Sequence, residues 1–374
     1  MAKLKRDPFT ILSGLRAWQL KHLAFLTGVN SSGTKAQLCR TLLDNTKKAA
    51  LPEPRCRVLS VDMGVKNLAF CVLDLQKLPQ DDEQSVVHDN NNTLSLHLTD
   101  WKRLDVSERM VTRDNPVDTK TSDPSRGDIV DKTTYAAETT PGDQPNIYSP
   151  SSLSKIAFNL ASEFLRYEPD YILIERQRFR SGGAPSIQEW TVRVNMLESM
   201  LWASLETMRR GHEKDLVAQK GIFPEVLEMS PRRVGMFWLA RKDFFPNPAD
   251  IATSLTAPIG CEQTTETEVK KKSFEKKDKI ALAQHWLSLS MTTDDMTVDA
   301  GIAPMVAMFC SPKVRRSRRR DQDNESEEEA EGGDVAMSGK LDDLADCLVQ
   351  GVTFGLWEQN RTRVREYLGH QESS

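Results

Sequence analysis

Acidic residues at three separated places in the sequence could together bind metal ions. Asp62 ends one apolar run, and Glu175 ends another, Tyr171–Ile174. Near the end of the chain, an apolar helical pattern opens with three more acids, Asp342, Asp343 and Asp346. Carboxylate oxygens are the ligands that Mg²⁺ prefers, usually together with phosphate oxygens of a substrate. These residue types favour metal-assisted hydrolysis of a phosphodiester, with two Mg²⁺ ions, or Mn²⁺ in their place, about 4 Å apart.

The acids can meet only if the elements that carry them pack together. Both apolar runs are typical of buried strands, and if these strands are neighbours, the two strand-terminal acids face each other at one sheet edge. A helix over about 341–360 would cross that edge. On this helix Asp342 and Asp346 lie about 40° apart around the axis, and Asp343 and Asp346 lie about 60° apart. Either pair could face the metals, so the choice between Asp342 and Asp343 stays open.

The rest of the pattern predicts an α/β protein. Short apolar runs predict strands at 57–62, 68–75, 94–101, 171–174 and 226–229, and helical periodicity predicts helices at 151–167, 186–208, 274–289 and 341–360. The helix at 274–289 begins with a lysine-rich turn. Two segments interrupt this pattern, a polar one near 79–150 that we expect to be flexible and a charge-rich one near 312–339 that we expect to be disordered.

The first 50 residues form a basic segment with nine Lys and Arg residues and only two acids. Apolar residues at helical spacing predict two short helices around a tight loop within 13–46. Thr34 and Gln37 have the spacing of a capping box, which would start the second helix and place Lys35 beside free backbone amides that can bind phosphate. A generic helical hairpin is the alternative interpretation.

This segment also resembles a SAP motif, a small DNA-binding module. The similar positions are Gln19–Lys21, Gly28–Val29, Ser32–Leu38, Arg40 and Leu42. The resemblance implies that residues 1–50 are a SAP-like DNA-binding helical hairpin, with Lys35 and Arg40 among its DNA contacts.

Three longer segments carry a second resemblance. Val58–Ala69, Ile174–Ser181 and Lys340–Asp346 resemble the signature segments of the fungal mitochondrial Holliday-junction resolvases, which are RNase H-like nucleases similar to bacterial RuvC. The resemblance implies an RNase H-like mixed sheet flanked by helices over 55–362, interrupted by the two insertions. It also implies that Asp62, Glu175 and Asp346, with Asp342 or Asp343, are the metal-binding catalytic acids.

The same resemblance implies a function. It predicts a Mg²⁺-dependent endonuclease that cuts four-way DNA junctions by paired symmetric nicks, one for each subunit of a homodimer, in mitochondrial DNA recombination. The mitochondrial location is implied by the resemblance alone, because the first residues form no clear transit peptide.

Basic residues beside the acids are candidate DNA contacts. Directly after Glu175 the chain reads Arg176, Gln177, Arg178, Phe179 and Arg180. The arginines could meet phosphates of the cut strand, and the aromatic ring could stack on an unpaired base at the junction centre. Lys66, near Gly64, could approach a phosphate as well. Surface ion pairs and core filling are the alternative roles for these side chains.

Other classes of protein fit the sequence less well. Each acid taken singly has an ordinary explanation, since Asp caps turns and acids are favoured in the first turn of a helix, so a non-catalytic SAP-type DNA-binding scaffold is the main alternative. An actin-like ATPase ranks last, because Val65 stands where its phosphate loop favours Thr or Ser.

Six scattered cysteines without a C-x-x-C pair argue against a zinc site. The longest apolar window, 301–310, is far shorter than the about 20 residues that a membrane span needs.

Overall fold

The computed structural model describes residues 7–48, 51–77, 94–106, 147–177, 189–214, 222–239, 274–289, 296–311 and 341–373. Three predicted DNA contacts, Arg178, Phe179 and Arg180, lie outside these residues, as do the charge-rich segment 312–339 and most of the polar segment 79–150. Among the helices of the described stretches, none is both long and apolar enough to cross a lipid bilayer.

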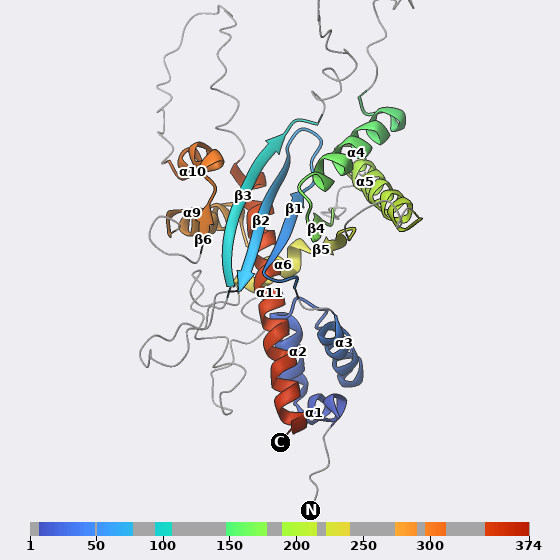
Figure 1. Cartoon of the computed structure of the whole chain (residues 1–374), viewed down its shortest axis with the longest axis vertical. Helices are drawn as coiled ribbons and strands as arrows, with labels where there is room; N and C mark the ends of the chain where they lie inside the picture. The colour runs from blue at the N-terminus through green and yellow to red at the C-terminus, as the bar shows by residue number, and fades with distance from the viewer. Residues whose placement is uncertain are drawn as a thin grey trace, which may run out of the picture.

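A six-stranded mixed sheet forms the centre of the protein (Figure 1). Its strands are β1 (Arg55–Asp62), β2 (Leu68–Lys77), β3 (Leu94–Leu104), β4 (Tyr171–Glu175), β5 (Glu225–Met229) and β6 (Met296–Val298). The spatial order is β5-β4-β1-β2-β3-β6; β1, β2 and β3 are antiparallel neighbours, whereas β4 runs parallel to β1 and β5 runs parallel to β4. The predicted RNase H-like mixed sheet is therefore confirmed. The three-residue strand β6, parallel to β3, was not predicted.

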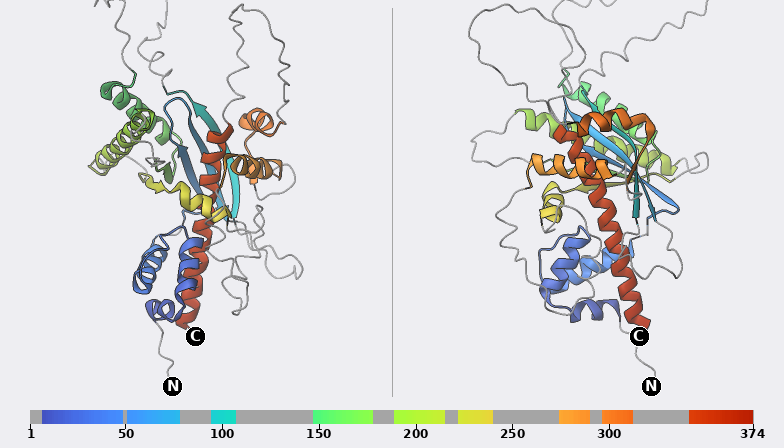
Figure 2. Two further views of the ribbon diagram at one scale, coloured as in Figure 1. Left: turned by 180° about the vertical axis from the view of Figure 1, so that it is seen from behind. Right: turned by 90° about the vertical axis from the view of Figure 1, so that its left-hand side faces the viewer.

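Helices cover both faces of the sheet, as predicted. One face packs against α4 (Pro150–Leu165) and α5 (Glu189–Lys214), and the opposite face packs against α9 (Lys276–Leu289) and α11 (Leu341–Ser373) (Figure 2). Alternate residues of each strand point to the two faces, so Leu59 of β1 joins the first apolar cluster and Val58 joins the second.

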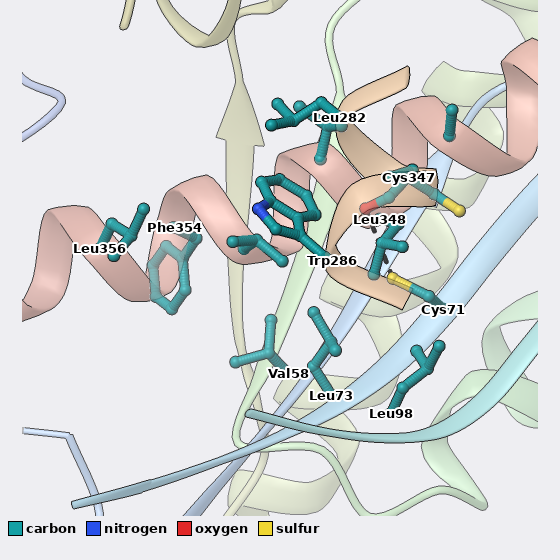
Figure 3. Packing of buried hydrophobic residues seen from close by; sticks show 14 of the residues in the cluster. Val58, Cys71, Leu73, Leu98, Leu282, Trp286, Cys347, Leu348, Phe354 and Leu356 are labelled. Atoms are coloured by element: carbon teal, nitrogen blue, oxygen red, sulfur yellow. Dashed lines mark hydrogen bonds between the residues drawn. The ribbon is translucent and has the colours of Figure 1, made fainter. Parts of the chain in front are cut away.

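Helix α11 crosses the sheet and extends well beyond it. It covers 33 residues, so it continues past the predicted end near residue 360. Its apolar side chains Leu348, Phe354 and Leu356 lie over those of the strands, and Trp286 of α9 closes the cluster (Figure 3). Gly351 lets the helix come close, because an added Cβ atom would lie 2.6 Å from Leu73 Cδ1.

Three helices, not the predicted two, precede the sheet: α1 (Pro8–Gly14), α2 (Ala17–Leu26) and α3 (Lys35–Lys47), which we call the amino-terminal module. Extended backbone at Leu15 and Arg16 separates α1 from α2. The prediction missed α1, although a proline at position 8 is typical of a helix start. The capping box is confirmed, because Thr34 Oγ1 accepts from the backbone N–H of Gln37 and the Gln37 side chain accepts from the N–H of Thr34.

Two further helices were not predicted. Helix α6 (Pro231–Leu239) follows β5, and α10 (Ala303–Cys310) forms within the apolar window near the end of the chain. Phe309 of α10 packs edge-on against Trp101 of β3, with ring centroids 4.7 Å apart. Phe309 and Val306 of α10 thereby join the apolar cluster on the α11 face of the sheet.

Candidate active site

The register of β1 and β4 places two acids side by side. The strands are parallel, and Val61 pairs with Ile174, so the following residues, Asp62 and Glu175, end the two strands at the same edge. Two residues before each acid, Ser60 and Leu173 face α11. Because side chains alternate along a strand, both acids point to the α11 face as well.

Hydrogen bonds fix α11 on this face next to Asp62. Ser60 Oγ donates to the carbonyl of Cys347 at 2.8 Å. Gln350 Nε2 donates back to Ser60 Oγ at 3.1 Å and to the carbonyl of Val61 at 3.2 Å. On the other side, Trp101 Nε1 donates to the carbonyl of Leu344 at 3.0 Å. These buried contacts set both the position and the rotation of the helix turns that carry the third acid.

The arrangement brings Asp62, Glu175 and Asp346 together. One carboxylate oxygen from each lies within 4.8 Å of the others. We call these three residues the acidic cluster. An all-oxygen donor set at this spacing fits a hard divalent cation such as Mg²⁺, which binds through a few carboxylates and completes its shell with water or phosphate.

Electrostatics also fit a cation at the acidic cluster. Burial raises the pKa of Asp62 well above its usual value, and the charges of Glu175, Asp346 and Asp343 raise it further. Burial likewise raises the pKa of Asp346, while the nearby Lys279 lowers it. Carboxylates crowded in this way repel one another, so a bound cation would relieve an unfavourable arrangement.

Asp342 and Asp343, between which the sequence could not choose, both lie close to the acidic cluster. Asp343 contributes to the raised pKa of Asp62, so its charge lies near the cluster. Asp342 forms an ion pair with Lys276. The charge of Asp342 also raises the pKa of Asp346, so both acids stay candidates for the fourth position.

Sequence reasoning missed two lysines at this site. Lys276 pairs with Asp342, and Lys279 Nζ lies 2.7 Å from Asp346 Oδ1. Both belong to the first turn of α9, and both ion pairs join residues more than sixty positions apart in the chain. The lysine-rich start of the predicted helix was the available signal, but the sequence did not indicate that this turn lies against α11.

The predicted DNA contacts next to Glu175 are described only in part. Arg176 is exposed and pairs with Glu228 of β5 at 2.8 Å. The backbone N–H of Gln177 donates to Glu198 of α5 at 3.3 Å. Lys66 is exposed in the turn that follows Asp62. Arg176 and Gln177 thus contact residues of β5 and α5 beyond the end of β4, and Lys66 lies in the turn between β1 and β2.

The other two predicted DNA contacts lie elsewhere. Lys35 opens α3, and Arg40 is exposed on the same helix. The amino-terminal module packs near the carboxyl end of α11, whereas the acidic cluster lies near its amino end (Figure 1). The structure therefore separates the predicted DNA contacts into two groups joined by one helix.

Comparison with known proteins gives a consistent result. The sequence model of the family described as mitochondrial resolvase Ydc2 / RNA splicing MRS1 matches residues 58–364. This match includes β2 to β6, the last five residues of β1 and every acid discussed above, but it leaves out the amino-terminal module.

The individual relatives share 20 to 30% sequence identity with this chain. A Schizosaccharomyces pombe protein named cruciform cutting endonuclease 1, mitochondrial, is 30% identical over 222 residues, which are 59% of this chain and 65% of that protein, slightly less than two thirds of its length. The Saccharomyces cerevisiae protein of the same name is 22% identical, with 94% of this chain and 85% of that protein covered. A crystal structure of the yeast mitochondrial Holliday junction resolvase Ydc2 is 20% identical, with 95% and 98% covered and a TM-score of 0.49.

Proposed function

Because the chain belongs to the family of the mitochondrial resolvase Ydc2 and the RNA splicing protein MRS1, we propose that it is a structure-specific endonuclease that cuts four-way DNA junctions. The family description names two different activities, so membership alone does not choose between them. The observation that supports hydrolysis is the convergence of three carboxylates from β1, β4 and α11 within 4.8 Å. A protein that only binds nucleic acid has no need for this repulsive arrangement.

In this proposal Asp62, Glu175 and Asp346, with Asp342 or Asp343 beside them, hold two Mg²⁺ ions, or Mn²⁺ in their place. When bound, the metal supplies activation of the attacking water and stabilisation of the leaving oxygen. The side chains of the chain itself bind and orient: the strand-terminal acids are fixed by the sheet register, and Asp346 is fixed by the contacts of α11. Lys279 has its ammonium group beside Asp346 and is placed to bind a phosphate oxygen of the cut strand.

The surrounding basic residues position the DNA. Arg176 and Lys66 are exposed just beyond the ends of β4 and β1, and we propose that they contact phosphates of the junction. Arg178, Phe179 and Arg180, which follow in sequence, are proposed to extend this contact to the junction centre. A homodimer would place two acidic clusters on one junction and make the paired nicks. The names of the two relatives support a mitochondrial location.

Incubation with a labelled four-way junction tests the proposal. We expect paired nicks with 5′-phosphate and 3′-hydroxyl ends in Mg²⁺, none in EDTA, and little cutting of duplex or flap controls. Glu175→Gln should abolish cutting but keep junction binding, whereas Glu206→Gln, on the exposed surface of α5, should cut normally. Binding without cutting by the unmodified protein in Mg²⁺ would favour the non-catalytic scaffold instead.

A further inference from the structure

One helix connects the acidic cluster with the amino-terminal module. Asp346 lies in the second turn of α11, and the module packs on the last turns of the same helix (Figure 2). Val364 and Leu368 of α11 share a buried apolar cluster with Leu12, Leu20 and other residues of the module. The module is thus part of the folded core rather than a domain on a loose linker.

The fit between module and helix is close at Gly28, in the loop between α2 and α3. Gly28 has a φ of +69°, and a Cβ atom added there would lie 2.2 Å from the ring of Trp357 on α11. Only glycine combines this left-handed backbone with so close an approach. The loop is therefore pressed directly against α11.

Polar contacts fix the module as well, and they bind the ends of its helices. Asn360 Nδ2 of α11 donates to the carbonyl of Leu26 at 2.9 Å. Arg365 donates through Nε to the carbonyl of Thr46 at 2.9 Å and through Nη2 to that of Lys48 at 2.6 Å. The last carbonyls of a helix lack partners within it, so these contacts satisfy groups that would otherwise need water. They also restrict tilting of the module on α11.

Helix α6, which follows β5, provides a second link between the module and the rest of the protein. Arg233 of α6 donates through Nη1 to the carbonyl of Gly28 at 2.6 Å. Its pKa is lowered by partial desolvation, raised by Glu228 and lowered by Arg176, so its guanidinium lies near the ion pair at the ends of β4 and β5. Glu175 ends β4 at the same edge. The loop at Gly28 is thus tied to the edge of the sheet that carries the acidic cluster.

We propose that the amino-terminal module is a rigid holder for one arm of the DNA junction, kept at a fixed distance from the cut by α11. This inference rests on the proposed function. Trp357 and Leu368 follow Asp346 by 11 and 22 residues, which is about 16 and 33 Å along a helix axis. At about 3.4 Å per base pair, the module reaches the stretch about five to ten base pairs from the cut.

The charges on this path fit a DNA backbone. Lys35 and Arg40 are exposed on α3, and Arg232 is exposed on α6, between the sheet and the module. We therefore assign Arg232 as an additional phosphate contact. A helix surface with several such cations gains affinity by releasing counterions from the duplex.

Junctions with arms of different length test the holder. One pair of opposite arms is made 4 or 12 base pairs long and closed by a hairpin, and the dissociation constant is measured in EDTA. We expect the unmodified chain to bind the long-armed junction about tenfold more tightly than the short-armed one. The short arms lack a few of the phosphates that the module would contact. Lys35→Ala with Arg40→Ala should remove this preference, and Arg232→Ala should reduce it. Equal affinity of the unmodified chain for both junctions would overturn the proposal.

Loosening the contact with α11 distinguishes a rigid holder from a tethered one. Asn360→Ala with Arg365→Ala leaves the exposed basic residues intact, yet it should reduce the long-arm preference to less than about threefold. Arg365→Lys, which keeps the charge, should have an intermediate effect, and Lys155→Ala on distant α4 should have none. If Asn360→Ala with Arg365→Ala keeps the long-arm preference of the unmodified chain, the rigid contact with α11 is irrelevant to binding.

The position of the arm gives a separate readout. Hydroxyl-radical footprints of the unmodified complex should show protection about five to ten base pairs from the cut. Gly28→Ala, compared with Gly14→Ala, which has open space around its added atom, should weaken or shift this protection. Protection confined to the junction centre would overturn the proposal. Failure to cut a long-armed junction in Mg²⁺ would contradict the proposed function alone, because binding and footprints are measured without cutting.

Discussion

The two ends of α11 differ in the groups that their polar side chains meet. At its start, Asp346 lies against Asp62 and Glu175 in a buried cluster of like charges. At its far end, Asn360 and Arg365 bind the carbonyls that end the helices of the amino-terminal module. Like charges are crowded where chemistry is proposed, and the contacts at the far end hold the helix that bears one of these acids. Unfavourable groups of this kind persist only when the surrounding structure fixes them.

Two buried acids illustrate the difference. The pKa of Asp62 is raised by burial and then by three neighbouring acids. The pKa of Glu358, near the module, is raised to about 7 by burial, but Arg361 and Lys48 oppose the shift. At the first site the acids next to Asp62 raise its pKa further, and the lysines of α9 pair with Asp342 and Asp346 instead; at the second site the cations act on Glu358 itself.

The largest expected effect comes from neutralising the acidic cluster. Asp62→Asn should reduce junction cutting by at least about a thousandfold, because a metal ligand is lost. Without metal, the same change should raise the melting temperature by a few degrees, since it removes like-charge repulsion. Cutting rates and thermal unfolding in EDTA measure both effects. A variant that cuts normally, or one that melts well below the unmodified protein in EDTA, would contradict this assignment of strain and function.

A smaller effect is expected from moving the start of α11 away from the sheet. In Gly351→Ala the new methyl group would lie 2.6 Å from Leu73 Cδ1 and 3.3 Å from Ser60 Cβ. Overpacking of this kind costs about 1–3 kcal/mol, and a shift of Asp346 should lower the cutting rate about tenfold.

Gly369→Ala is the matched control on the same helix. No atom lies within 4 Å of its added Cβ atom, so the gain in helix propensity, up to about 1 kcal/mol, should dominate. Denaturant unfolding and cutting rates compare the two variants. Equal effects of the two changes would show that close packing at Gly351 does not position the acids.

The smallest effect on junction cutting is expected at Glu358, where the predicted change is in the pH dependence of stability near the module. Glu358 faces Arg361, Lys48, Glu225 and Arg365, and its folded pKa of about 7 exceeds its ordinary value of 4.5. An acid whose pKa is raised in the folded state contributes its full stability when the pH is below its pKa in the unfolded chain. It loses that contribution as the pH rises toward its pKa in the folded state. The unfolding free energy should therefore fall between about pH 4.5 and 7, by at most about 1.4 kcal/mol per unit.

Glu358→Gln tests this sign. The variant should lose the part of the pH dependence that comes from Glu358, whereas Glu366→Gln, on the exposed surface of the same helix, should keep it. Denaturant unfolding at a series of pH values in EDTA gives the comparison. An unchanged pH dependence in Glu358→Gln would show that the charge at this position is already balanced in the folded state.

Local sequence patterns predicted the meeting of the strand-terminal acids on the condition that their strands are neighbours, and they did not predict the lysines beside the cluster. Period-two burial and strand ends predicted that Asp62 and Glu175 would meet, and the structure places them together. The choice between Asp342 and Asp343 depends on the rotation of α11, which Ser60 and Gln350 set from far away in the chain. Contacts between residues so far apart in the chain produce no hydrophobic periodicity, so they cannot be predicted from a single sequence.

The elements that the sequence did not predict are short or depend on distant partners. Strand β6 has three residues, too few for a visible alternation, and it pairs with residues of β3 that are 200 positions away in the chain. The link between the module and α11 depends on single residues such as Gly28 and Asn360, whose partners are far apart in sequence. The SAP-like role of the module stays a prediction.

Direct measurement of metal binding is the sharpest test of the account. Mn²⁺ binding followed by electron paramagnetic resonance should show bound ions in the unmodified chain and a loss of at least tenfold in affinity in Asp346→Asn, with Glu206→Gln unchanged. Equal Mn²⁺ binding by the unmodified chain and by Asp346→Asn would contradict the claim that the acids of β1, β4 and α11 form one metal site.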